Sequence, residues 1–214
     1  MSANDISKLY LVLDAGPRAV SRLEAALAGA NFSVVLLIPP HGKTLEAASV
    51  LPLIEIAQAN DVAVMLADDA QLVRTTRADG VHLRWSNDIG SRAADAREVL
   101  GKAFMLGVDV GQSRHDAMEI GEAGADYIAF GIPEHAEDRE AARARRAELC
   151  HWWSEIFEVP CVAFNVENGI EAEALAAAGA DFVAVRLPPA STADDIKSFV
   201  ADIYQRLATI ADAA

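Results

Sequence analysis

The amino-acid sequence predicts a single α/β domain, residues 1–214, folded as a (β/α)8 TIM barrel. Three observations support this fold class: the length, a junction motif that recurs five times, and eight short apolar runs that alternate with helical segments. With 214 residues, of which 52% are hydrophobic and 23% charged, the chain can bury the core of one globular domain.

Eight runs rich in β-branched and aromatic residues have the length and composition of buried parallel strands. Both faces of such strands are buried, either between two layers of helices or between the helices and the interior of a barrel. The runs are therefore apolar throughout. They occupy residues 9–13, 33–38, 63–66, 82–83, 104–108, 128–131, 161–164 and 183–186. A segment that can form a helix follows each run, as a (β/α)8 barrel requires.

A short junction of small residues followed by Asn or Asp precedes five of these runs. The five copies are residues 29–32, 59–62, 78–81, 124–127 and 179–182. Glycine after a helix tolerates the left-handed conformation of a C-cap, and Asn or Asp favours the turn into the next strand. The repeat therefore predicts a series of similar β/α units.

Two helical segments are supported by their own patterns. In the last, Thr192 and Asp195 form an approximate capping box before apolar residues at helical spacing, which are Ile196, Phe199, Val200, Ile203, Leu207 and Ile210. The longest connection, residues 132–160, holds an Arg- and Glu-rich helix with Trp152 and Trp153 near its end. We expect these tryptophans to pack against the barrel, with a subunit contact or a lid edge as the alternative.

An open doubly wound sheet is the alternative fold. Such a sheet usually carries a Gly-rich GxGxxG turn after its first strand. Here the first run is followed by Asp14, Ala15, Gly16 and Pro17, which do not form that pattern. The barrel is therefore the favoured fold.

The charge balance limits the partners. Eighteen Lys and Arg residues against 32 Asp and Glu residues give a formal net charge of −14, which repels nucleic-acid phosphates and anionic membrane surfaces. We expect a small-molecule ligand, and neither nucleic acid nor a membrane as a partner. The aromatic-rich segment 149–157 is compatible with a homo-oligomer.

The sequence also predicts a cytoplasmic location. Its first residues lack the basic and apolar regions of a signal peptide, and the longest apolar run, residues 34–40, is far shorter than the roughly 20 residues that span a bilayer. The two cysteines, Cys150 and Cys161, have no metal-binding or CxxC spacing and are too few for a disulfide framework. This usage indicates a reducing compartment.

Two neighbouring strand ends carry candidate metal ligands. In (β/α)8 barrels the chemistry is built at the carboxyl ends of the strands and in the loops that follow. Asp68 follows the third run directly and Asn87 follows the fourth, so that their oxygens can converge on a hard cation such as Mg²⁺. The adjacent Asp69 and Asp88 fit equally well as solvated loop carboxylates or helix caps.

Other strand ends supply candidate ligand-binding residues. His82 alternates with apolar neighbours, so it is either a core histidine with a hydrogen-bond partner or a ligand-binding or proton-transfer group. Arg186 ends the eighth run, where a cation can meet an anionic ligand. Pro188 and Pro189 follow it and lack the N–H groups that usually build a phosphate site.

Four segments, residues 10–14, 78–83, 124–131 and 178–185, resemble thiamine phosphate synthase and its thiazole tautomerase-like relatives. The matches occur in the same order over nearly the whole chain. The resemblance implies a TIM barrel and, in an active member, a transferase that joins a pyrimidine diphosphate to a thiazole phosphate with Mg²⁺ on the diphosphate. On this basis Gly131, together with His82, Asp109, Asn165 and Arg186, is a candidate for ligand binding.

Position by position, the chain departs from the family pattern. Three polar residues of the family's second strand, which contact the diphosphate, fall on Val35, Leu37 and Pro39. Of the two metal-binding carboxylates, Asp68 is kept and Asn87 replaces the other. Asp109 stands in place of a Ser, Asn165 and Val166 replace two glycines, and residues 132–135 have no counterpart of a Thr- and Lys-containing segment.

Two hypotheses follow, and no residue is assigned as catalytic. A diphosphate leaving group needs positive charge or hydrogen-bond donors, so their loss predicts that ordinary synthase activity is lost. The first hypothesis is a divergent synthase-like protein of thiamine or related heteroaromatic phosphate metabolism, with altered or lost catalysis. The second is a non-catalytic small-molecule sensor or partner subunit on the same barrel.

Overall fold

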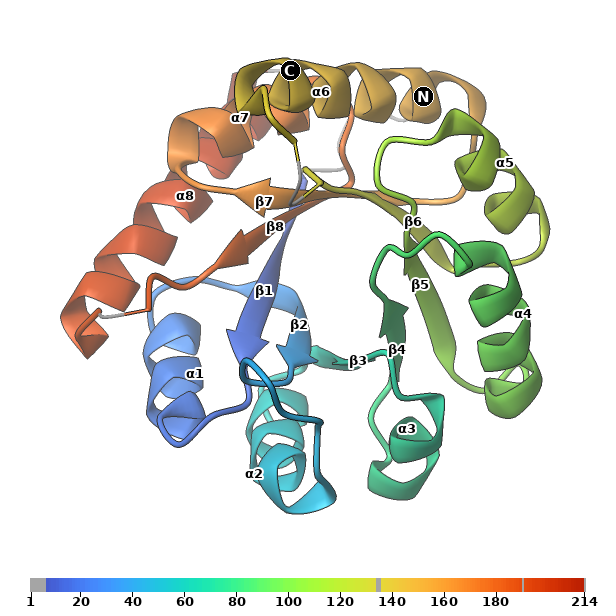
Figure 1. Cartoon of the computed structure of the whole chain (residues 1–214). Helices are drawn as coiled ribbons and strands as arrows, with labels where there is room; N and C mark the ends of the chain where they lie inside the picture. Colours follow the sequence, from blue (N-terminus) through green and yellow to red (C-terminus); the bar gives the residue numbers. More distant parts are fainter. Residues whose placement is uncertain (1–6, 134–135, 190, 214) are drawn as a thin grey trace.

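The computed structural model of the chain describes residues 7–133, 136–189 and 191–213. Its eight strands form a closed parallel barrel in which each strand pairs with the next along the chain and β8 pairs with β1 (Figure 1). The strands are β1 (Lys8–Asp14), β2 (Phe32–Ile38), β3 (Ala63–Ala67), β4 (Gly80–Leu83), β5 (Met105–Asp109), β6 (Tyr127–Phe130), β7 (Cys161–Val166) and β8 (Phe182–Arg186). The predicted (β/α)8 barrel is confirmed.

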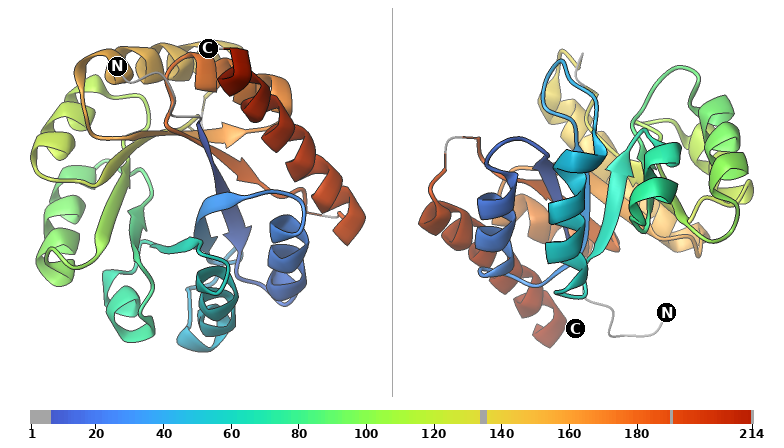
Figure 2. Two further views of the ribbon diagram at one scale, coloured as in Figure 1. Left: turned by 180° about the vertical axis from the view of Figure 1, so that it is seen from behind. Right: turned by 90° about the horizontal axis from the view of Figure 1, so that it is seen from below.

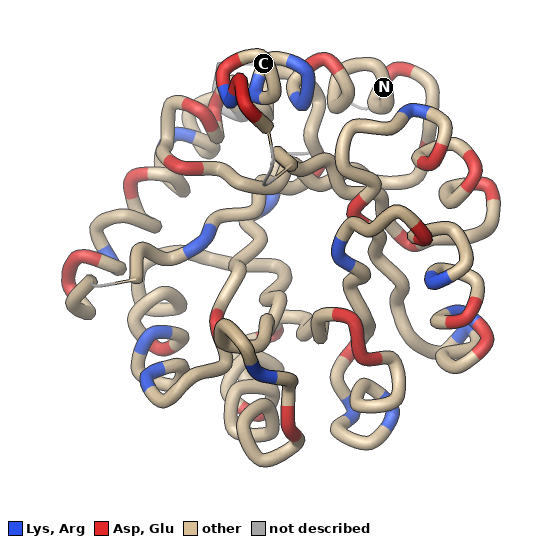
Figure 3. The backbone as a smooth tube through the Cα atoms, viewed as in Figure 1, with Lys and Arg blue, Asp and Glu red and all other residues tan. Residues whose placement is uncertain are grey.

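Within the described residues, eight helices alternate with the strands and surround them (Figure 2). They are α1 (Ala19–Leu27), α2 (Ala47–Gln58), α3 (Ala70–Thr76), α4 (Ile89–Leu100), α5 (Arg114–Glu122), α6 (Arg139–Ile156), α7 (Gly169–Ala177) and α8 (Ala193–Ala213). Charged residues of both signs are interspersed over this helical ring (Figure 3). None of the helices in the described part of the chain has both the length and the apolar composition needed to cross a bilayer.

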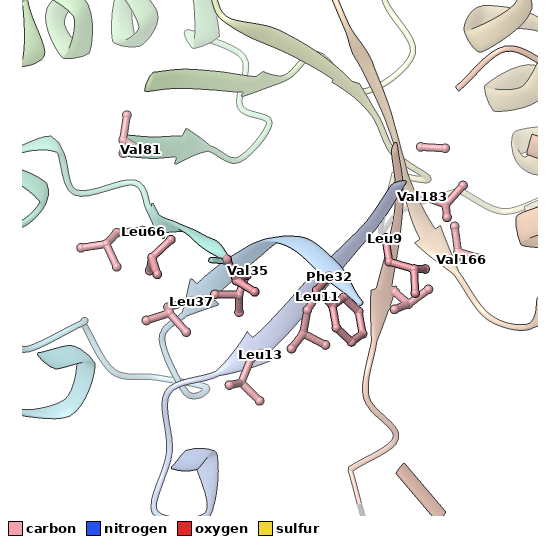
Figure 4. Close-up of a cluster of buried hydrophobic side chains, with 14 of the residues drawn as sticks. Leu9, Leu11, Leu13, Phe32, Val35, Leu37, Leu66, Val81, Val166 and Val183 are labelled. Atoms are coloured by element: carbon pink, nitrogen blue, oxygen red, sulfur yellow. The ribbon is translucent and has the colours of Figure 1, made fainter. Parts of the chain in front are cut away.

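Successive strand residues point to opposite sides of the barrel wall and build two apolar layers. The outer layer, between strands and helices, includes Leu9, Leu11, Val35 and Leu37 (Figure 4). The inner layer fills the barrel with Tyr10, Val12, Leu36, Ile38, Met65, Ala67, Tyr127, Ala129, Val162, Phe164 and Ala184. The interior is therefore a packed core below the mouth, as in other barrels of this class.

The junction motif has a shared geometry. Asp79, Asp126 and Asp181 each precede a strand, and each side chain accepts a hydrogen bond of 2.7 Å from a backbone N–H near the start of the preceding strand. Gly124 and Gly179 have φ angles of 95° and 91°, in the left-handed region that glycine tolerates. The aspartate thus links two neighbouring strands through a hydrogen bond. The sequence predicted only that it turns the chain into the next strand.

The two helices expected from their patterns are confirmed. At the start of α8, Thr192 Oγ1 accepts from the Asp195 N–H at 3.2 Å and Asp195 Oδ2 accepts from the Thr192 N–H at 2.9 Å, which is a capping box. On α6, Trp153 is fully buried, and Trp152 packs against it with ring centroids 5.8 Å apart while the Arg114 guanidinium lies over the Trp152 ring. Packing against the barrel is therefore the observed role of both tryptophans.

Candidate functional site

A cavity of about 650 Å³ opens at the carboxyl ends of the strands. It is lined by Val12, Leu36, Ile38, Asp68, His82, Arg84, Trp85, Arg92, Asp109, Gly111, Gly131, Ile132, Pro133, Phe164, Asn165 and Arg186. The structure thus brings together all five predicted ligand-binding residues and Asp68. Asn87 is exposed and is not among the lining residues, and Glu134 and His135 lie outside the described residues.

The second strand presents different side chains to the cavity from those expected. Val35 and Leu37 are fully buried in the outer layer, whereas Leu36 and Ile38 line the cavity. The position-by-position match was therefore wrong by one residue here, and in a strand a shift of one residue moves a side chain to the opposite face. The chemical consequence is unchanged, because the cavity-facing residues of β2 are apolar in either register.

Asp68 is held by two arginines. Its Oδ1 accepts from the Arg84 backbone N–H at 2.9 Å and from Arg92 Nη2 at 2.8 Å, and its Oδ2 accepts from Arg84 Nε at 2.5 Å. Burial opposes ionisation of Asp68, but the hydrogen bonds from Arg84 and Arg92 outweigh it and lower the pKa of this carboxyl. Asp68 is therefore a carboxylate with strong protein partners.

These contacts bear on the predicted magnesium site. Mg²⁺ takes oxygen ligands in a near-octahedral arrangement, usually with one or two carboxylates and several waters. Both oxygens of Asp68 already bind guanidinium groups, and the described residues contain no group of three His, Cys, Asp or Glu side chains that could hold a metal ion. The residues in this arrangement do not fit Mg²⁺, and ligation by Asp68 and Asn87 stays a prediction of the resemblance.

His82 is a buried histidine with a hydrogen-bond partner that also borders the cavity. Its Nδ1 lies 2.9 Å from the Tyr127 hydroxyl, which in turn lies 2.8 Å from the Tyr10 hydroxyl. The imidazole stacks on Phe164 with ring centroids 4.8 Å apart. Burial lowers the pKa of His82 from 6.5 to about 3, so the ring is neutral at physiological pH. It therefore borders the cavity without adding charge to it.

Asp109, Gly131 and Asn165 form the opposite wall. Asp109 Oδ1 accepts from the Gly111 N–H and Asn165 Oδ1 from the Ile132 N–H, both at 2.8 Å. A Cβ atom on Gly131 would lie 3.1 Å from Asp109 Oδ2 and 3.3 Å from Asn165 Oδ1. The missing side chain at Gly131 thus lets a ligand reach a carboxylate oxygen and an amide.

The pKa of Asp109 predicts a pH-dependent effect on stability. Burial, only partly offset by the Gly111 hydrogen bond, raises the pKa of Asp109 from 3.8 to about 6. Folding therefore disfavours the ionised carboxylate, a cost that is absent below pH 4 and complete above pH 6. We expect Asp109→Asn to raise the free energy of unfolding by about 1–2 kcal/mol at pH 8 and to change it little at pH 4.

Urea unfolding between pH 4 and pH 8 measures this difference. Asp95→Asn, at an exposed position of α4, is the control and should differ from the native protein by an amount that does not change in this window. If Asp109→Asn raised the free energy of unfolding equally at pH 4 and pH 8, the raised pKa of Asp109 would be contradicted.

Arg186 lies at the end of β8, where its Nη2 donates to Asp14 Oδ1 at 2.7 Å. The loop that follows directs backbone carbonyls toward α1: Arg22 donates to the carbonyls of Leu187, Pro188 and Pro189, and Arg18 also donates to Pro189. In residues 187–189 the backbone thus contributes three carbonyl acceptors, and Pro188 and Pro189 have no N–H to donate. This agrees with the expectation that the loop after β8 is not a phosphate-binding loop of N–H groups.

Sequence reasoning places Arg84 at the mouth of the barrel without a role, and it misses Arg92. Arg92 lies on α4 and reaches back to the Arg84 carbonyl at 3.0 Å, Ser86 Oγ at 2.8 Å and Asp68. The candidates were sought at strand ends and in the loops, and the position of Arg92 one turn after the β4–α4 loop was the signal that could have found it. Asp69 instead caps α3 by accepting from the Leu72 N–H at 2.8 Å, as one of its two alternatives predicted.

Comparison with known proteins agrees with the barrel fold. A family model described as thiamine monophosphate synthase matches residues 9–187. The thiamine-phosphate synthase of Erythrobacter litoralis is 41% identical over 186 residues, which are 84% of this chain and 86% of that protein. That of Rhodospirillum centenum is 38% identical over 185 residues, covering 83% and 86%.

A solved structure has the same fold. The thiamine phosphate pyrophosphorylase of Pyrococcus furiosus superposes with a TM-score of 0.74 at 20% sequence identity, covering 96% of this chain and 98% of that one. The family match spans strands β1 to β8, including every described residue that lines the cavity. The chain belongs to the thiamine monophosphate synthase family.

Proposed function

We propose that the cavity binds a small heteroaromatic phosphate of thiamine or related metabolism, and that the diphosphate chemistry of the synthases is altered or lost in this chain. The observation that carries this proposal is the apolar β2 wall: Leu36 and Ile38 line the cavity on the strand where the resemblance implies polar residues that contact a diphosphate. Membership of the family supports the proposed class of ligand. The side chains on β2 support the proposed change in the diphosphate chemistry.

The cavity has apolar surface suited to a planar ring. Val12, Leu36 and Phe164 line it, and the neutral His82 ring supports Phe164 by stacking on it at an interplanar angle of 16°. Pockets for small molecules typically combine such surface with a few polar groups that orient the ligand. A heteroaromatic ring fits this description.

The cavity also carries charged side chains that suit an anionic group. Arg84, Arg92 and Arg186 line the cavity together with Asp68 and Asp109. Guanidinium groups bind phosphate oxygens through paired N–H donors. A single phosphate on a ring can therefore be accommodated, with the ring against the apolar side.

Departure of a diphosphate requires more than this cavity offers on β2. Negative charge develops on the leaving group, and removal of one donor that stabilises such charge typically slows a reaction by about a hundredfold or more. Leu36 and Ile38 supply no donor, and Asp68 is engaged by arginines. We therefore expect the formation of thiamine phosphate from a pyrimidine diphosphate and a thiazole phosphate to be at least about a hundredfold slower than in a synthase with polar residues on β2.

Thermal unfolding with candidate ligands tests the binding part of the proposal. Thiazole phosphate, thiamine phosphate and the pyrimidine diphosphate are each compared with their dephosphorylated forms. At a concentration 100 times its Kd, the true ligand should raise the unfolding midpoint by roughly 5 °C, because it binds only the folded state. Arg186→Gln should weaken that binding about tenfold, whereas Arg206→Gln, at the contact between α7 and α8 and not among the cavity-lining residues, should not change it.

A synthase assay with the Erythrobacter litoralis relative run alongside tests the catalytic part. Ligand binding without turnover supports a sensor or partner-subunit role, and turnover of a different heteroaromatic phosphate supports an altered enzyme. Formation of thiamine phosphate at a rate comparable with that of the relative would overturn the proposed loss. No shift with any compound would overturn the proposed ligand class.

A further inference from the structure

We infer that Arg84 and Arg92 occupy the place of a divalent cation at Asp68, so that the cavity binds phosphoryl anions through guanidinium groups without a metal. The inference deepens the proposed function and rests on it for the identity of the natural ligand. It states which groups supply positive charge to the bound anion. Anion binding can be tested with inorganic phosphates, without knowing the natural ligand.

The first support is the saturation of Asp68. A carboxylate offers about four lone-pair positions, and Asp68 uses three of them for the Arg84 N–H, Arg84 Nε and Arg92 Nη2 at 2.5–2.9 Å. Its backbone is also fixed, because its N–H donates to the His82 carbonyl at 3.0 Å and its φ is 60°. A metal ion at Asp68 could use only the one remaining lone-pair position, next to two guanidinium groups.

The second support is the sign of the charge. Two guanidinium groups share one carboxylate, so the cluster of Asp68, Arg84 and Arg92 is cationic as a whole. The like charge repels a divalent cation and attracts an anion. A bound metal in a typical phosphate site has the same electrostatic role, which is to present positive charge to phosphate oxygens.

The third support is the difference between the two arginines. Arg92 is held by three acceptors, which are Asp68, Ser86 Oγ and the Arg84 carbonyl, and 29% of its side chain is exposed. Arg84 contacts Asp68 through Nε, and 54% of its side chain is exposed at the cavity wall. Its Nη1 and Nη2 donors, which Asp68 does not use, are therefore placed to bind an anion, with Arg92 as a fixed counter-charge.

Arg186 supplies positive charge from another part of the mouth. Its side chain lines the cavity from β8, 59% exposed, and its Nη2 is oriented by Asp14 at 2.7 Å. In the closed eight-stranded barrel β8 lies opposite β4, the strand that Arg84 follows, so Arg186 adds to the positive potential of the mouth from the opposite rim. Asp109 in the same cavity opposes anion binding when it is ionised, which favours a position for the anion beside Arg84 and Arg92. The metal-independent site for one phosphoryl group is therefore centred on Arg84.

Isothermal titration with inorganic pyrophosphate and inorganic phosphate tests this inference. We expect saturable binding in EDTA, and no heat or thermal shift from Mg²⁺ alone. Arg84→Gln should weaken anion binding at least tenfold, and Arg84→Lys should restore only part of it, because the ammonium lacks the guanidinium fork. Arg74→Gln on α3 is the matched control, since Arg74 donates only to the Val99 carbonyl, and it should bind as the native protein does.

The outcomes separate this inference from the proposed function. Anion binding that requires Mg²⁺, or Mg²⁺ binding that Asp68→Ala abolishes, overturns the metal-free site even if a thiamine-related compound binds. Pyrophosphate binding in EDTA with no binding of any thiamine-related compound upholds the site and removes the proposed ligand. The absence of phosphate and pyrophosphate binding by a folded protein overturns the metal-free site, whereas the proposed ligand class is overturned only if the thiamine-related compounds also cause no thermal shift.

Discussion

Replacement of Arg146 by methionine is expected to lower the free energy of unfolding by about 2–4 kcal/mol, because it removes the buried partner of Glu171 and the donor to the Phe164 carbonyl, while Arg143, 3.5 Å from Glu171 Oε1, keeps part of the charge pairing. Arg146 on α6 is 1% exposed, donates from Nη1 to the Phe164 carbonyl and donates from Nη2 to Glu171 Oε1 at 2.5 Å. The other Glu171 oxygen accepts from the Glu167 N–H at 2.8 Å. One guanidinium thus joins α6, β7 and α7 behind the cavity.

Urea unfolding of Arg146→Met and Arg145→Met makes the test specific. Arg145 is the neighbouring helical residue and is 40% exposed on its side chain. Among the described residues it forms an ion pair with Glu148 three residues later and with no other carboxylate, so its loss should cost no more than about 0.5 kcal/mol. The ligand affinity of Arg146→Met should also fall, since Phe164 and Asn165 lie directly on the segment that Arg146 holds. A loss below about 1 kcal/mol would show that the buried pair contributes little net stability.

Replacement of Gly107 by alanine is expected to lower the free energy of unfolding by about 3 kcal/mol and to disrupt the barrel interior. A Cβ atom on Gly107 would lie 1.9 Å from Cζ and 2.3 Å from the hydroxyl oxygen of Tyr127. The ring would have to move, which breaks the hydrogen bond between the Tyr127 and Tyr10 hydroxyls and the one between Tyr127 and His82 Nδ1. His82 would then lose the partner that orients it toward the cavity.

The control for Gly107→Ala is Gly90→Ala on α4. A Cβ atom at Gly90 meets no atom within 4 Å, and alanine favours a helix by about 1 kcal/mol over glycine, so this variant should be as stable as the native protein or more so. Tyrosine fluorescence and urea unfolding measure the effect. The double variant Gly107→Ala/Tyr127→Val should recover part of the lost stability if the clash with the ring is the cause. No recovery would contradict that explanation.

The strands and helices were predictable because their signals are local. Apolar runs such as residues 161–164 match β7, and the Thr192–Asp195 capping box marks the start of α8. The junction aspartates were recognised by recurrence, although their role in joining neighbouring strands was not. That role depends on the pairing of strands distant in sequence, as when Asp181 reaches Cys161, 20 residues away.

The cavity was predictable in position, and its chemistry was less so. The rule that strand ends form the mouth of a barrel placed Asp68, His82, Asp109, Asn165 and Arg186 together correctly. The same rule could not identify the partners of Asp68, because Arg92 belongs to a helix 24 residues later in the chain. Nor could it set the register of β2, where pairing with β1 brings Leu36 beside Val12 and turns both into the barrel.

By itself, the sequence determined the (β/α)8 barrel, the family and the residues available at the mouth, because hydrophobic pattern, junction chemistry and motif order act along the chain. Only the tertiary structure decided which of those side chains meet, that Asp68 is held by Arg84 and Arg92, and that His82 is neutral beside Tyr127. The physical reason is that hydrogen bonding, charge pairing and burial depend on distances of a few ångströms between residues that lie far apart in the chain. Closure of the barrel sets those distances.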